Sequence, residues 1–250
     1  MEFYDLMKYG HIGLGSLSLA TFWLSGFSRK GSPVHKASGK LYLLAMTGIL
    51  ISASIMIAIF ALRPRPASMA FLGDLAAFLG YLVVITSTSV WCSWRAIRDK
   101  QNWARYTGPV YKLLMVMNGL SGLLIAYIGL FVAEQMALIF VGFSMVGIFG
   151  AIGMWRFSRQ APANPGWWLK EHFGAMIGNG VATHIAFLSI GLPKLVPLLS
   201  GPVQQNLAWL GPLALSFVAA FYLNRKYAPA RKAVGQVVTA SAKSRSAASR

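Results

Sequence analysis

Seven apolar runs separated by short polar segments divide most of the chain. They lie at about 9–27, 41–62, 71–92, 112–132, 136–155, 170–192 and 205–224. Each is close to the roughly 20 apolar residues that a helix needs to cross the hydrocarbon core of a bilayer. The pattern therefore predicts an all-α integral membrane protein in which residues 1–227 form a single bundle of seven transmembrane helices.

The run from Trp167 to Leu192 has the most informative arrangement of polar positions. At about 100° per residue, a helix over this run has three faces. The polar face holds Asn179, His172, Thr183, Met176, Phe187, Gly180 and His184; a face of small residues holds Gly174, Gly178, Ala182 and Ala186; a third holds Val181, Ile177, Leu188 and Ile185. We expect the polar face to line an internal site, the small residues to admit a neighbouring helix, and the third face to contact lipid.

The basic residues predict the orientation of the bundle. Nineteen of the 23 lysines and arginines fall in alternate connections or in the C-terminal tail, and only six residues are acidic. By the positive-inside rule, this places the N-terminus outside and the C-terminus in the cytoplasm. Residues 228–250 are predicted to be a disordered basic tail that is attracted to anionic lipid. The net charge of +17 lies in short loops between apolar runs, which argues against nucleic acid as a partner.

Four histidines lie at two predicted depths. His35 and His172 are near the cytoplasmic face, while His11 is near the outer face. His184 lies about 18 Å along the helix from His172, in the outer half. One histidine pair in each leaflet suits two bis-histidine b-type haems that pass electrons across the membrane. The single cysteine leaves no pair for covalent haem attachment.

A glycine lies one turn from three of these histidines, and it would leave room for a porphyrin. These glycines are Gly15, Gly39 and Gly180. Asn179 and Thr183 are candidates to hydrogen-bond the ligands or cofactor and so tune it.

Other functions remain open. The four histidines are also candidate ligands of a transition metal, and His11 and His184 could form a zinc or copper site with the outer-side carboxylates Asp5, Asp74 and Glu134. Alternatively, the histidines are structural and bind no cofactor. The chain carries no GxSxG, HExxH or other hydrolytic or transferase motif, so an enzymatic role is uncertain. Two alternative functions remain. The protein could be a non-enzymatic subunit or assembly factor of a larger membrane complex, or it could be a metal or small-molecule transporter.

A string of residues in the first two runs resembles a known family. It reads His11-x3-Gly15, then Lys30-Gly31-Ser32-x2-His35-Lys36-x2-Gly39-Lys40-x-Tyr42-x3-Met46, with His172-x3-Met176 and His184-x-Ala186-Phe187 late in the chain. This is similar to the bacterial multi-helix membrane proteins grouped as domain of unknown function 2306. The resemblance implies that the four histidines belong to one pattern, which favours the haem or metal interpretation, and that the protein lies in a bacterial inner membrane. His172 and His184 are about 120° apart on a regular helix, which departs from familiar dihaem cytochromes b.

Overall fold

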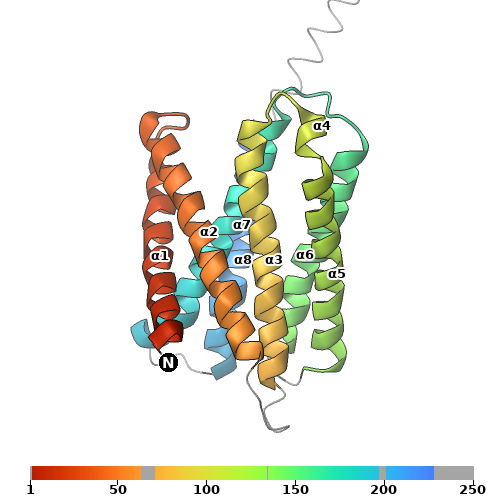
Figure 1. The fold of residues 1–250 in the computed structure, drawn as a ribbon. Helices are drawn as coiled ribbons and strands as arrows, with labels where there is room; N and C mark the ends of the chain where they lie inside the picture. Colours follow the sequence, from red (N-terminus) through yellow and green to blue (C-terminus); the bar gives the residue numbers. More distant parts are fainter. Residues whose placement is uncertain (1, 63–70, 134, 197–200, 228–250) are drawn as a thin grey trace, which may run out of the picture.

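The computed structural model describes residues 2–62, 71–133, 135–196 and 201–227, and Figure 1 shows how their helices are arranged. The helices are α1 (Glu2–Phe27), α2 (Pro33–Ala61), α3 (Phe71–Arg98), α4 (Trp103–Tyr106), α5 (Pro109–Phe131), α6 (Ala137–Arg159), α7 (Trp167–Leu195) and α8 (Gly201–Tyr227). The described residues contain no strand. The all-helical prediction is confirmed, whereas the predicted basic tail, 228–250, lies outside the described residues.

Six of the long helices are apolar enough to cross a membrane: α2, α3, α5, α6, α7 and α8. The protein is therefore a multi-pass membrane protein. The predicted span at 9–27 lies in α1, which is long enough but is not among the six. Glycine, serine and histidine interrupt its apolar sequence, and these residues lower its hydropathy.

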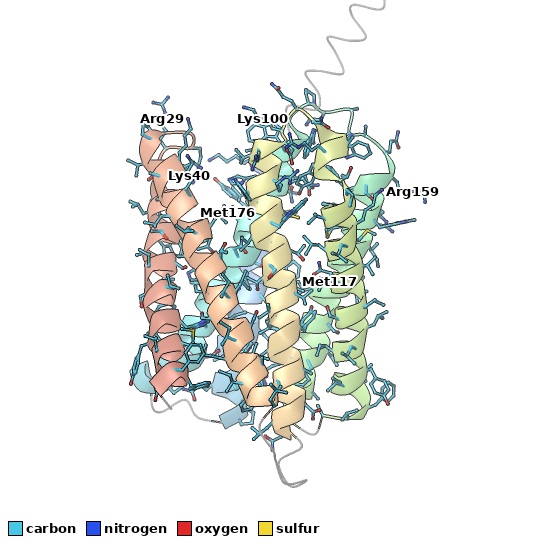
Figure 2. The ribbon with its side chains drawn as sticks, in the orientation of Figure 1. Arg29, Lys40, Lys100, Met117, Arg159 and Met176 are labelled. Atoms are coloured by element: carbon cyan, nitrogen blue, oxygen red, sulfur yellow. The ribbon has the colours of Figure 1, made fainter. Side chains whose placement is uncertain are left out.

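The long helices run alternately up and down, so the predicted connections with many basic residues meet at one end of the bundle (Figure 1). Arg29, Lys40, Lys100 and Arg159 all lie toward this end in Figure 2, and we call it the basic end. Only five residues separate α5 from α6, and the two helices form an antiparallel hairpin (Figure 1).

The α3, α5 and α6 helices approach closely where glycine removes a side chain. A Cβ atom added to Gly147 of α6 would lie 2.9 Å from the carbonyl oxygen of Asn118 on α5. One added to Gly129 of α5 would lie 2.9 Å from Cβ of Phe140 on α6. These small residues are therefore used in packing within the chain.

Two buried clusters hold α7 against the rest of the bundle. The first gathers Phe78 of α3, Ile125 of α5, Phe140 of α6 and Ile185 of α7. Ile185 is only 5% exposed, so the prediction that it faces lipid is wrong. The second lies at the basic end, where Tyr106 of α4 is fully buried and donates its hydroxyl proton to Glu171 at 3.2 Å.

Candidate functional site

His35 is fixed by the way α2 begins. Gly31 has φ of +80°, a left-handed conformation that favours glycine, and it turns the chain out of the loop after α1. The Ser32 hydroxyl then caps α2 by accepting the backbone N–H of His35 at 3.2 Å, and Pro33 occupies the first helical turn. The Gly-Ser-x-x-His part of the sequence motif is thus a helix start that places one imidazole at the basic end.

His35 and His172 make the same kind of hydrogen bond. The Nδ1 atom of His35 lies 3.0 Å from the carbonyl oxygen of Ser25 on α1. The Nδ1 atom of His172 lies 2.9 Å from the carbonyl oxygen of Ser93 on α3. A carbonyl oxygen only accepts, so each neutral ring carries its proton on Nδ1 and has an unprotonated lone pair on Nε2. This is how proteins usually orient a histidine that ligates a metal.

His172 also interacts electrostatically with groups at the start of α2. His172 is within electrostatic range of both His35 and Lys30. The Lys30 ammonium group donates to the carbonyl oxygens of Ser25, at 3.2 Å, and Gly26, at 2.6 Å. Burial, and then the nearby charge of Lys226 at the end of α8, lower the pKa of Lys30. His35 and His172 of the predicted inner pair thus lie within electrostatic range of each other, and Lys30 is within range of His172.

The other two histidines are held apart by their own partners. His184 donates from Nδ1 to the carbonyl oxygen of Gly180, at 2.7 Å, and its Nε2 accepts the indole N–H of Trp23 at 3.1 Å. His11 bonds through Nδ1 to the Ser52 hydroxyl of α2 at 2.9 Å.

The register of α1 against α7 explains this separation. Phe22 of α1 lies against Gly180, and Gly15 lies against Phe187. His11 is four residues before Gly15, so it is level with about residue 191 of α7. That position is about 10 Å along the helix from His184. The structure does not bring the predicted outer pair together.

The three glycines near the histidines face protein side chains. A Cβ atom at Gly180 would lie 2.4 Å from Cζ of Phe22, whose ring fills the space beside it. A Cβ atom added to Gly15 would lie 3.9 Å from Cε2 of Phe187, and one added to Gly39 would lie 3.5 Å from Oγ of Ser25. The space beside Gly180 is therefore used to pack α1 on α7, whereas Gly39 has only an ordinary contact.

Asn179 and Thr183 belong to a buried polar chain between α2, α3 and α7. Asn179 is fully buried and donates from Nδ2 to the Ser93 hydroxyl at 3.0 Å. Thr183 donates to the Asn179 carbonyl oxygen at 3.0 Å, and its hydroxyl lies 3.1 Å from that of Tyr42. Because Ser93 also accepts from His172 through its carbonyl oxygen, the chain runs from that imidazole into the bundle. Asn179 and Thr183 of the polar face predicted for α7 therefore point inward, whereas Phe187 of that face is 37% exposed.

The chain matches no protein-family model, no curated protein and no solved structure. The geometry of the site therefore has to carry the functional argument. Over the described ranges, no three histidine, cysteine, aspartate or glutamate side chains gather in a group that could hold a metal ion. An axial haem site differs, because it needs only two protein ligands.

Sequence analysis missed the groups that orient the imidazoles. Two of them, the carbonyl oxygens of Ser25 and Ser93, have no side-chain signal at all. Trp23 and Tyr42 do have signals, since each is a polar aromatic within a helix, and the buried ends of such side chains usually find a hydrogen-bond partner. The periodicity of α1 alone would not have assigned Trp23 to His184.

Proposed function

We propose that this chain is a membrane cytochrome of the b type that holds one haem between His35 and His172 at the basic end. The observation that carries the proposal is the matched pair of Nδ1 hydrogen bonds to backbone carbonyl oxygens. They fix both rings and leave both Nε2 lone pairs available as axial ligands. The two rings come from different helices, α2 and α7, as ligation from facing helices requires.

The surroundings of the pair suit a haem. The two carboxylates of a haem need nearby cations. Lys30 is within electrostatic range of His172, and Lys226 is within electrostatic range of Lys30. Deeper in the bundle, Asn179 and Thr183 supply the polar groups that position the Ser93 segment. A bound haem would supply a one-electron carrier, and the chain would supply its ligation and orientation.

The proposal differs from the two-haem prediction at the outer pair. The Nε2 atom of His184 accepts the Trp23 N–H, and the space beside Gly180 holds the Phe22 ring. Binding a second haem there would require both contacts to be lost. We therefore propose one haem per chain, and structural roles for His11 and His184.

We further propose that α1 also crosses the membrane, which makes seven spans. It is 26 residues long and lies beside α2 over most of its length (Figure 1). With seven spans, the N-terminus and the C-terminus lie on opposite sides of the membrane. The basic end then lies in the cytoplasm and the N-terminus outside, in a bacterial inner membrane. Kinship with domain of unknown function 2306 remains a prediction.

The proposal is tested by the visible spectrum of the detergent-purified protein, oxidised and then reduced with dithionite, together with haem quantitation as the pyridine haemochrome. We expect a Soret band, sharp reduced bands and one haem per chain. His35→Ala and His172→Ala should each abolish stoichiometric haem binding, because either change removes an axial ligand.

His11→Ala and His184→Ala are the matched controls, because they also remove an imidazole from the bundle but should leave the haem content unchanged. If the protein held two haems per chain and His184→Ala lost one of them, the outer haem site would exist and the one-haem proposal would be overturned. A colourless protein from haem-replete cells would remove the cytochrome function altogether. Co-purifying subunits would then favour the assembly role, and substrate-dependent thermal stabilisation would favour a transporter.

A further inference from the structure

A shallow apolar groove runs between α5 and α6 on the outside of the bundle. Its volume is about 320 Å³, and all of its lining side chains are apolar. The lining includes Val116, Gly119, Leu120 and Leu123 of α5, and Ile152 and Trp155 of α6. Leu120 is 65% exposed and Leu123 is 58% exposed, so the groove opens away from the core.

Small residues form the floor of this groove. A Cβ atom added to Gly119 would lie 3.4 Å from Cβ of Ala151, so the two helices meet closely here without a large side chain between them. The larger side chains of Leu120 and Trp155 rise at its margins. The result is a furrow along the helix axes, suited to an extended hydrocarbon chain.

Two cations lie where the groove approaches the basic end. Lys112 is four residues before Val116, so the two lie on the same face of α5. On α6, Cζ of Arg159 lies 5.2 Å from the centroid of the Trp155 ring, which is itself part of the groove. Figure 2 shows Arg159 at this end of the molecule. Within the described residues, neither Lys112 nor Arg159 forms an ion pair with a carboxylate.

We propose that this groove binds one anionic phospholipid, with an acyl chain along the groove and the phosphate between Lys112 and Arg159. An apolar furrow that ends in two cations matches a molecule that has a hydrocarbon chain at one end and a negative charge at the other. The exposed indole of Trp155 lies between these two regions, at the level where tryptophan prefers the membrane interface. This site is separate from the proposed haem site, and neither depends on the other.

Native mass spectrometry of the purified full-length chain, titrated with phosphatidylglycerol or with phosphatidylcholine of the same acyl chains, tests the proposal. We expect one phosphatidylglycerol to be retained in preference to phosphatidylcholine. Arg159→Ala should weaken that binding about fivefold, the effect of one cation near a membrane surface, and so should Lys112→Ala. Leu120→Trp should weaken binding of both lipids by obstructing the furrow.

The chain contains a matched control. Arg98 stacks on Trp94 of α3 at the same end, with Cζ at 5.3 Å from the ring centroid, and neither residue lines the groove. Arg98→Ala should leave phosphatidylglycerol binding unchanged. An equal loss in Arg98→Ala and Arg159→Ala would show only general attraction to the basic end and would overturn the site. Equal retention of phosphatidylglycerol and phosphatidylcholine would also overturn the site. The same holds if inorganic phosphate, at the same concentration as the lipid, displaced phosphatidylglycerol from the protein. Circular dichroism of each variant separates lost binding from lost folding.

Discussion

The close packing of α6 against α3 and α5 makes a prediction that can be worked from distances. Gly147 of α6 lies where α3 and α5 meet. A methyl group at this position would lie 2.8 Å from the Tyr81 hydroxyl oxygen and 2.9 Å from the Asn118 carbonyl oxygen. The Tyr81 hydroxyl also accepts the backbone N–H of Gly147 at 2.9 Å. Gly147→Ala must therefore displace a backbone segment or break that hydrogen bond.

The expected cost follows from three contributions. Overpacking a close-packed interior costs about 1–3 kcal/mol. Loss of one hydrogen bond adds about 0.5–1.5 kcal/mol, and replacing glycine by alanine in a helix returns about 0.5–1 kcal/mol. Gly147→Ala should therefore destabilise the protein by about 0.5–4 kcal/mol. Gly150, one turn away on α6, has nothing within 4 Å of an added Cβ, so Gly150→Ala should be stabilising by about 0.5–1 kcal/mol.

The measurement is the free energy of unfolding of the two variants in mixed micelles, followed by circular dichroism as denaturing detergent is added. The two changes are chemically identical and lie on the same helix, so their difference isolates the contact with α3 and α5. We expect opposite signs and a difference of about 1.5–4.5 kcal/mol. If Gly147→Ala were as stable as Gly150→Ala, the close approach of these three helices would be refuted.

Three further predictions use the same assay. Ser32→Ala removes the cap on the His35 N–H and should cost about 1 kcal/mol, most of it restored by Ser32→Asp; no loss would contradict the capped start of α2. Tyr42→Phe removes the hydroxyl beside Thr183 and should cost about 0.5–1.5 kcal/mol, and an unchanged stability would show that this buried contact is not made. Burial raises the pKa of Tyr106 far above its ordinary 10.0, so the native state keeps a proton that the unfolded chain loses at alkaline pH. Stability should therefore fall above about pH 10 by up to about 1.4 kcal/mol per pH unit; Tyr106→Phe should remove this component of the slope, and an unchanged slope would contradict the assignment.

The helices could be predicted from the sequence because the bilayer imposes a simple rule on them. Spanning segments must be apolar for about 20 residues, and α2, α3, α5, α6, α7 and α8 follow that rule. The first helix does not, because glycine, serine and histidine interrupt its apolar sequence, and only some of these residues are covered by other helices. Ser18, for example, is fully buried although α1 lies at the edge of the bundle in Figure 1.

The candidate site was harder to predict, because depth along a helix does not give register between helices. The sequence placed His11 and His184 in the same leaflet, but the contacts of Phe22 with Gly180 set α1 about two turns away from that pairing. Ile185 was misplaced for a related reason: its cluster includes Phe78 and Phe140, and periodicity within α7 cannot reveal either neighbour. The inner pair was predictable because both histidines are close to helix starts at the basic end.

The contact between Trp23 and His184 has a consequence for how the chain is assembled in the cell. The two residues are 161 positions apart, so at about 5–20 residues per second the ribosome finishes the second one roughly 10–30 s after the first. His11 meets Ser52 only 41 residues later, so α1 can pair with α2 long before α7 exists. During that interval the indole N–H of Trp23 lacks its His184 acceptor, although the ring can already stack on Phe27. The α1–α2 hairpin is therefore complete in its own contacts before α7 is made, and its contact with α7 is a later step of assembly.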